Sequence, residues 1–172
     1  DKPNATLSAL KLLAKIQNLT ITVLLGKRAP HYKTVVSYCS KLNNVRQLDF
    51  VEEMAELMLD HDLAVGAPGS TSWERACLGL PCIVIPLAEN QFEIASKLQV
   101  NNAVIVVNLY ELQSKFSDGI DRIMSKWDEY VQANLSLCDG LGIYRFLMEF
   151  QRLCEPKKYR YDLIEAGRQD IE

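Results

Sequence analysis

Short apolar runs alternate with helical patterns along most of this 172-residue chain. The runs are rich in Val, Ile, Leu and Cys, and after each one the apolar residues recur at helical spacing. Continuous apolar strands separated by helices are typical of a parallel sheet that is covered on both faces. The sequence therefore predicts an α/β fold, a Rossmann-like parallel sheet flanked by helices, with a helical C-terminus.

The pattern also gives the expected position of each element. Strands are expected at 21–25, 45–50, 63–66, 82–85 and 103–107. Helices are expected at 5–17, 32–42, 54–58, 71–78, 91–98, 109–125, 127–137 and 141–153. We expect one ligand-binding domain over residues 1–155, and a charged tail or terminal helix over 156–172.

The first residues enter a helix without a preceding strand. Asn4 is expected to cap this helix, directly after Pro3. In a doubly wound domain such a helix follows a strand and a tight turn. We therefore expect an upstream strand, or a whole upstream domain, to belong with this sequence.

Composition and charge exclude several classes of function. The net charge of −3 creates no field that favours nucleic acid or an anionic membrane. No apolar run approaches the ~20 residues that span a bilayer. Five cysteines without C-x-x-C spacing indicate reduced thiols and a cytoplasmic protein. Only two histidines occur, and neither belongs to a zinc pattern, so no metal site and no cofactor are expected.

One strand–turn–helix segment, residues 62–74, is the strongest candidate for a binding site. Main-chain N–H groups at the helix start, with Gly69 and the hydroxyls of Ser70 and Thr71, are suited to a phosphate. The Glu74 carboxylate, one turn later, can accept both hydroxyl groups of a ribose. Thr71 and Glu74 also have the spacing of a capping box, which explains the pair without a ligand.

Polar residues follow the next strand as well. Glu89, Asn90 and Gln91 come directly after the strand that ends at Pro86. Amide side chains can donate to and accept from sugar hydroxyls or phosphate oxygens. The alternative is a polar loop in which Asn90 caps a helix. The carboxyl ends of parallel strands lie at one edge of a sheet, so this loop is expected beside Gly69.

Two further loops are weaker candidates. After the strand at 45–50, the main chain near Val51 can read a base edge and Met54 can pack beside the base, although Met54 also fits a core position. Lys27 or Arg28 can approach a phosphate, but such residues are more often solvated. His31 has no partner carboxylate in the sequence to make it an acid or base. No set of residues typical of nucleophilic catalysis occurs, so no catalytic residue is predicted.

Four segments resemble the C-terminal domain of GT-B-fold UDP-sugar enzymes: residues 51–58, 66–75, 78–81 and 88–91. The likeness is greatest to the UDP-sugar hydrolase of the pseudaminic-acid pathway and the related spore-coat polysaccharide proteins. The lipid II-forming UDP-GlcNAc transferase is a more distant relative. The resemblance covers roughly residues 1–155 and implies the C-terminal half of a GT-B fold.

The resemblance implies roles for the residues of the turn. Glu74 would hold the ribose hydroxyls, while Gly69, Ser70 and Thr71 would cradle the diphosphate. Pro68 departs from the family, which usually has a small residue there, and its ring could stiffen the loop.

The resemblance also implies the surroundings of the base and the sugar. The uracil would meet the main chain near Val51 and the side of Met54, and the sugar would face Asn90 and Gln91. Asp1 is similar to the last residue of the family's Gly-Gly-x-Asp loop. The catalytic histidine of the hydrolase lies in an N-terminal domain that has no counterpart in this sequence.

The expected function is therefore to bind a UDP-sugar within a UDP-sugar hydrolase of nonulosonic-acid or surface-polysaccharide synthesis. One alternative is the donor-binding half of a GT-B glycosyltransferase. Another is a binding subunit that acts with a partner chain carrying the other half.

Overall fold

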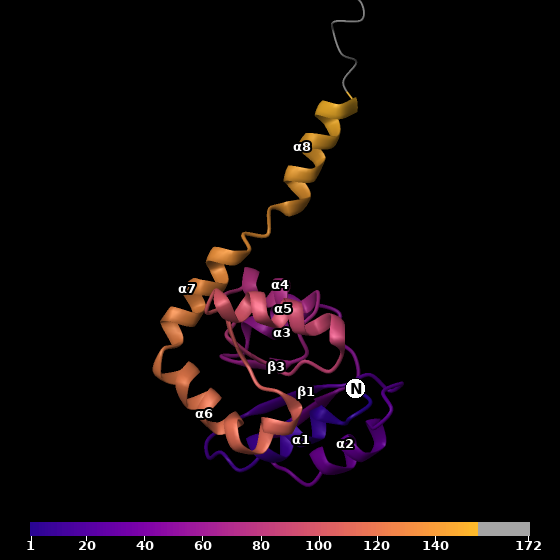
Figure 1. Ribbon diagram of the computed structural model, residues 1–172. Coiled ribbons are helices and arrows are strands. Elements are labelled where there is room, and N and C mark those ends of the chain that lie inside the picture. Colours follow the sequence, from indigo (N-terminus) through magenta and orange to yellow (C-terminus); the bar gives the residue numbers. More distant parts are fainter. Residues whose placement is uncertain (155–172) are drawn as a thin grey trace, which may run out of the picture. The chain divides into compact units, whose positions relative to one another are not determined.

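In the computed structural model, which describes residues 1–154, strands and helices alternate from α1 to β5 (Figure 1). The strands are β1 (Ile21–Leu24), β2 (Val45–Leu48), β3 (Ala64–Gly66), β4 (Cys82–Val84) and β5 (Val104–Val106). The helices are α1 (Ala5–Leu13), α2 (Tyr32–Cys39), α3 (Met54–Leu59), α4 (Thr71–Cys77), α5 (Glu89–Val100), η1 (Leu109–Glu111), α6 (Leu112–Ser125), α7 (Trp127–Leu137) and α8 (Gly142–Cys154). The described residues divide into two units, residues 1–138 and a second unit that begins at Asp139. The expected tail over 156–172 lies outside the described residues.

All strand pairs of the first unit are parallel, so the predicted α/β class is confirmed. The strands form two sheets, β1–β2 and β3–β4–β5, where the sequence predicts one. Among residues 1–154, one edge of β1 and one edge of β3 have no strand partner. A separate sheet has its own edges, and these edges carry main-chain groups that a further strand can pair with.

Helix α1 packs against both sheets. Ala9 lies in one apolar cluster with Ile83 of β4, whereas Leu10 lies in another with Val23 of β1. Leu13, partly buried, packs against both clusters. This helix therefore joins the cores of the two sheets.

The start of α1 differs from the prediction. Asn4 stands at the N-cap with a left-handed backbone (φ 57°), and its side chain makes no capping hydrogen bond. Instead the Asp1 carboxylate accepts hydrogen bonds from the main-chain N–H groups of Ala5 (2.8 Å) and Thr6 (3.0 Å). The predicted cap is thus wrong, because Asp1 satisfies the free N–H groups of the first turn. The Asn4 Oδ1 atom is buried without a hydrogen-bond partner among the described residues.

Strand β4 is buried along its whole length. Ile83 faces a cluster that includes Phe116 of α6, and Cys82 and Val84 face a second cluster that includes Leu98 of α5. Helices cover both faces of this sheet, which explains why the strand reads as a continuous apolar run.

The turn after α4 brings two helices close together. Gly79 has a left-handed backbone (φ +67°), and a Cβ atom added there would lie 3.1 Å from Leu135 Cγ of α7. On the same helix, the buried Asn134 side chain donates to the carbonyl oxygens of Ala103 (2.6 Å) and Tyr130 (2.8 Å). These contacts fix α7 against the sheet.

The second unit is described by itself. Its helix α8 begins at Gly142, and Arg145 in the first turn of this helix pairs with Asp139, which precedes it. The hydrogen bond from the Arg145 guanidinium lowers the pKa of Asp139 to about 2. Phe146 and Phe150 stack along the helix with ring centroids 6.0 Å apart. Across residues 1–154, none of the helices combines the length and apolar character needed to cross a membrane.

Candidate functional site

The predicted site lies at the carboxyl ends of β3 and β4. Gly66, the last residue of β3, pairs with Val84, the last residue of β4. The loops that follow these strands, residues 67–70 and 85–88, therefore start side by side. This confirms that the two predicted loops share one edge of a parallel sheet.

The loop after β3 presents several hydrogen-bond donors. Within the described residues, the main-chain N–H groups of Ser70 and Thr71 have no acceptor. The N–H of Gly69 is engaged, since it donates to Ser72 Oγ at 3.2 Å. A Cβ added at Gly69 would meet no atom within 4 Å, so there is open space beside this residue. Thus Gly69 leaves room for a ligand, while Ser70 and Thr71 have free donors.

The structure contradicts the capping-box explanation for Thr71 and Glu74. Helix α4 begins at Thr71 itself, with Ser70 at the N-cap in a helical conformation, and no side chain caps the helix. A capping side chain needs an extended backbone at its own residue, which Ser70 does not have. The Glu74 carboxylate is exposed and makes no hydrogen bond or ion pair in the described part of the chain. It is available to a ligand.

Arg75 is a site residue that was not predicted from the sequence, and it is only 5% exposed. Its guanidinium donates to the carbonyl oxygens of Ala67 and Thr71, on either side of the loop, each at 3.1 Å. In the sequence, Arg75 could have been found from its spacing to Thr71. Residues four apart lie one turn apart on the same face of a helix, so this arginine is expected next to the loop.

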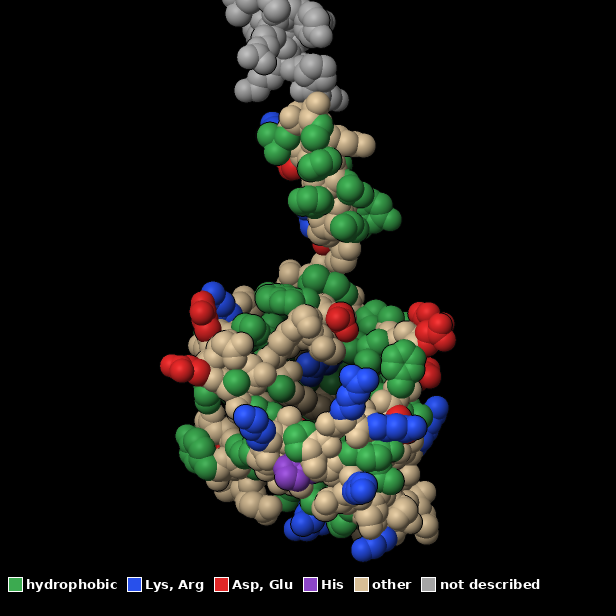
Figure 2. All heavy atoms as spheres, turned by 90° about the vertical axis from the view of Figure 1, so that its right-hand side faces the viewer, with side chains coloured by type: hydrophobic (Ala, Val, Ile, Leu, Met, Phe, Trp, Pro, Cys, Tyr) green, Lys and Arg blue, Asp and Glu red, His purple; other side chains and the backbone are tan. Residues whose placement is uncertain are grey.

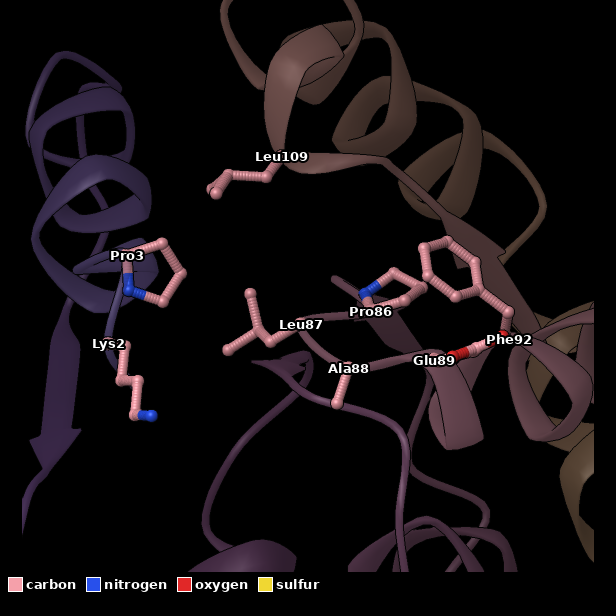
Figure 3. A pocket seen from close by; sticks show the side chains of 8 residues that line it. All are labelled: Lys2, Pro3, Pro86, Leu87, Ala88, Glu89, Phe92 and Leu109. Carbon is pink, nitrogen blue, oxygen red and sulfur yellow. The ribbon is translucent and has the colours of Figure 1, made fainter.

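The loop after β4 borders a cavity of about 590 Å³. Figure 3 shows that the start of the chain lies on one side of this cavity and the segment from Pro86 to Ala88 on the other. The cavity is lined by Lys2, Pro3, Pro86, Leu87, Ala88, Glu89, Phe92 and Leu109. Most of the lining is apolar, and Lys2 and Glu89 are its charged members. The sequence predicted Glu89 but gave no signal for Lys2, Pro3 or Leu109, which are distant along the chain.

The other two residues predicted in this loop have different surroundings. Gln91 Oε1 accepts a hydrogen bond from the main-chain N–H of Leu87 at 2.8 Å. Its amide group thereby holds the loop, and its two N–H donors remain. Asn90 is exposed, and it lies within α5, which has Ala88 at its N-cap. The alternative in which Asn90 caps this helix is therefore wrong.

Val51 lies between β2 and α3, and Met54 is the first residue of α3. Both residues are half-buried, and no hydrogen bond in the described residues links this segment to Gly69 or Glu74. Met58 is the buried methionine of α3, at 8% exposure. Part of the Met54 side chain therefore remains accessible, and its contact with a base stays a prediction.

A polar cluster occupies the end of β2. Asp49 accepts hydrogen bonds from Tyr32 Oη (2.5 Å) and Gln47 Nε2 (2.8 Å), and it lies 3.3 Å from Lys27 Nζ. The hydrogen bond from Tyr32, followed by that from Gln47, lowers the pKa of Asp49. Lys27 thus has Asp49 as an ion-pair partner, while 73% of its side chain remains exposed.

The histidines also have structural partners. His31 Nε2 donates to the main-chain carbonyl of Lys2 at 2.8 Å. His61 bonds the Leu57 carbonyl (2.7 Å) and Thr22 Oγ1 (2.8 Å). Within residues 1–154 no cluster of His, Cys, Asp and Glu has the composition of a metal site.

The face of the molecule in Figure 2 is hollowed, and Lys and Arg side chains lie around the hollow. The N-terminus lies on this side of the molecule in Figure 1. Its residues Lys2 and Pro3 line the cavity described above. The local charge is thus positive on a chain whose net charge is −3, which favours an anionic ligand here.

Comparison with known sequences gives a family match. The family described as "Glycosyltransferase family 28 C-terminal domain" matches residues 3–137. The spore coat polysaccharide biosynthesis protein SpsG of Bacillus subtilis is 27% identical over 154 residues, which cover 87% of this chain and 45% of SpsG. The chain thus spans less than half of the length of this relative.

Solved structures with the same fold include two glycosyltransferase complexes. The spinosyn rhamnosyltransferase SpnG, complexed with spinosyn aglycone, matches 78% of this chain and 36% of its own, with TM-score 0.66 and 22% identity. The glycosyltransferase VinC, in complex with dTDP, matches 84% of this chain and 37% of its own, with TM-score 0.63 and 15% identity. These likenesses identify the fold as the C-terminal half of a GT-B fold, as the sequence predicts.

Proposed function

Because the chain belongs to the glycosyltransferase family 28 C-terminal domains, we propose that it binds a UDP-sugar at the carboxyl ends of β3 and β4. One observation carries this proposal: the Glu74 carboxylate is exposed and unengaged in the described structure, one turn from a loop with free donors. A carboxylate can accept both ribose hydroxyls, and N–H groups at a helix start can bind phosphate oxygens.

The remaining predicted residues complete the proposed site. Ser70 and Thr71 donate to the diphosphate, and Gly69 leaves space for its close approach. The uracil lies against the main chain near Val51 and the side of Met54. VinC, solved in complex with dTDP, supports a nucleoside diphosphate as the ligand class.

The sugar is proposed to enter the cavity beside the loop after β4. Glu89 lines this cavity, and Gln91 holds the loop through Leu87 while keeping its N–H donors. Asn90 is exposed next to them. These polar groups can bind sugar hydroxyls, while the apolar lining accommodates the less polar face of a sugar ring.

We propose that the complete protein hydrolyses its UDP-sugar in surface-polysaccharide synthesis, with pseudaminic-acid synthesis as the specific pathway. The likeness to SpsG, a spore coat polysaccharide biosynthesis protein, supports the polysaccharide assignment. A water molecule would attack the sugar while UDP leaves, and the start of α4 would stabilise the negative charge on the leaving UDP. The group that activates water would come from another domain or chain. The likeness to SpnG and VinC supports the alternative of a glycosyltransferase donor half.

The two separate sheets support the expected upstream strand. A further parallel strand would use the edges of β1 and β3 that have no partner among residues 1–154. In a longer protein that includes this strand, the main-chain amides of β1 and β3 should exchange more slowly with solvent. Unchanged exchange at both edges would contradict this part of the proposal.

An amide-shift NMR titration with UDP, and with CDP as the control, tests the binding site directly. We expect saturable shifts at Gly69 to Glu74 and near Met54 with UDP, and much smaller shifts with CDP. Absence of shifts at millimolar UDP in a folded sample would contradict the proposed site. An assay of UDP release by the complete protein, with and without acceptors, then separates hydrolysis from transfer.

A further inference from the structure

Arg75 is a buried cation without a counter-ion in the described structure. Its side chain is 5% exposed, and among residues 1–154 no carboxylate pairs with it. Its hydrogen-bond acceptors are the carbonyl oxygens of Ala67 and Thr71, and the Cys82 sulfur at 2.6 Å. Burial raises the pKa of the Cys82 thiol, so this acceptor is neutral at physiological pH. Buried charges are normally paired with an opposite charge.

The guanidinium contacts the donor loop at both ends. Nη2 donates to Ala67, the first residue after β3, and Nε donates to Thr71, the first residue of α4. The intervening residues, 68–70, are held between these two contacts. Because the guanidinium is planar, with N–H donors in fixed directions, it fixes two carbonyls at once, which a lysine ammonium does less well.

The surroundings leave little freedom for the guanidinium. A Cβ added at Gly66 would lie 3.4 Å from Nη1 of Arg75. The third contact, to Cys82, comes from the neighbouring strand β4. The side chain is therefore anchored by β3, β4 and α4 together, directly behind the loop that the proposed function assigns to the diphosphate.

We propose that Arg75 is a positioning residue for the diphosphate of the sugar donor: it fixes the loop 67–71 from behind and supplies the positive charge that the diphosphate balances. This inference rests on the proposed function. Arg75 acts through the loop and needs no direct contact with the ligand. Its effect is specific to the phosphate groups, and the nucleoside part of the ligand is bound independently of it.

The test compares UDP with uridine on the wild-type protein and on Arg75→Met and Arg75→Lys. In Arg75→Met, affinity for UDP should fall at least about tenfold, as expected for the loss of a charge-assisted interaction. Affinity for uridine should stay unchanged. Arg75→Lys keeps the charge and loses the planar guanidinium. Its affinity for UDP should lie between those of the wild type and Arg75→Met. Arg122→Met, at an exposed arginine of α6, is the matched control and should bind UDP as the wild type does.

A purely structural role predicts a different result. If Arg75→Met weakened UDP and uridine equally, or weakened neither, the inference would be overturned. Failure of the wild-type protein itself to bind UDP would instead refute the proposed function.

A second measurement needs no variant at all, and so holds if Arg75→Met fails to fold. The ¹⁵N resonance of Arg75 Nε in the wild-type protein should shift on addition of UDP or pyrophosphate, and should not shift with uridine. An Nε resonance that is unmoved by UDP, while the amides of Ser70 and Thr71 do move, would overturn the inference.

Discussion

The sulfur atoms of Cys77 and Cys138 lie 2.8 Å apart, although the residues are 61 positions apart in sequence. Cys77 ends α4 and Cys138 follows α7, and neither is part of a disulfide. Both side chains are half-buried, so small oxidants can reach them. The two sulfur atoms are thus close to the ~2.05 Å separation of a disulfide bond.

We therefore predict that oxidised glutathione converts this pair to a disulfide. The two thiols lose their hydrogens, and one glutathione disulfide is reduced to two glutathione molecules. The loop-closure model predicts that the bond stabilises the first unit by roughly 4 kcal/mol. Peptide mapping and denaturant titration, with and without reductant, measure both effects.

The exposed Cys154 requires a matched control for this experiment. Cys154→Ser removes intermolecular crosslinks and should leave the internal disulfide and its stabilisation intact. Adding Cys77→Ser should abolish both. If glutathione adducts formed in place of the internal disulfide, the prediction would be wrong.

Glu74→Gln should reduce affinity for UDP by about tenfold or more, since hydrogen bonds to a charged group are stronger than neutral ones. The wild-type protein should prefer UDP to 2′-deoxy-UDP, and the variant should lose most of this preference. Stability should change by less than about 0.5 kcal/mol, because the exposed carboxylate holds no other group. Isothermal titration calorimetry and thermal unfolding give these quantities.

A surface carboxylate on a neighbouring helix provides the comparison. Glu93 of α5 forms an exposed pair with Lys97, and Glu93→Gln should leave the affinity for UDP unchanged. Equal preference for UDP and 2′-deoxy-UDP in the wild type would show that Glu74 does not bind the ribose.

Tyr32→Phe should reduce stability in a pH-dependent way. The hydrogen bond from Tyr32 lowers the pKa of Asp49 below its value in the unfolded chain. The stabilisation of the fold by this bond is therefore complete above about pH 4, and it is lost as the pH falls through the pKa of folded Asp49. The same bond raises the pKa of Tyr32, so its contribution is present below about pH 10 and is lost above the folded pKa. The difference in the free energy of unfolding between the wild type and Tyr32→Phe should therefore be largest near neutral pH.

Urea titrations at a series of pH values measure this difference. Tyr38→Phe, at another tyrosine of the same helix, is a useful control, because no hydrogen bond from its hydroxyl is present in the described structure. If the free energies of unfolding of the wild type and Tyr32→Phe differed by the same amount from pH 2 to pH 7, the hydrogen bond to Asp49 would not explain the effect of Tyr32.

Gly79→Ala should destabilise the first unit by about 1–3 kcal/mol. The residue has φ +67°, and an added Cβ would lie 3.1 Å from Leu135 Cγ and 3.2 Å from Val131 Cγ1. Gly142→Ala is the control: its added Cβ meets nothing within 4 Å, so no loss of stability is expected. Thermal unfolding of both variants decides whether the α4–α7 contact depends on this glycine.

Local signals predicted most of the fold. Strand β4 was readable because both of its faces are buried, and α6 because its apolar residues recur on one face. The helix expected over 5–17 ends at Leu13, and the left-handed Asn18 (φ 58°) lies before β1. The spacing of apolar residues does not reveal such turns, because several residues of the turn are apolar and continue the helical pattern.

The candidate site was predictable where its residues are adjacent in sequence. Gly69, Ser70 and Thr71 were identified because a turn and a helix start occur together. Arg75 was missed because its spacing from Thr71 does not by itself reveal that the side chain is buried against Cys82 of another strand. Lys2 and Leu109 were missed for the same reason, since only the tertiary fold brings them to the cavity of Glu89.

Helix α1 has a mechanical consequence for the first unit. The two sheets share no strand pairing in the described part of the chain, yet Ala9 packs with one and Leu10 with the other. Motion of one sheet relative to the other would therefore change the packing of this helix. The Asp1 carboxylate that caps α1 is at its start, and Lys2 beside it lines the cavity. The start of α1 and one wall of the cavity are thus the same short stretch of chain, so a displacement of α1 would also displace this wall.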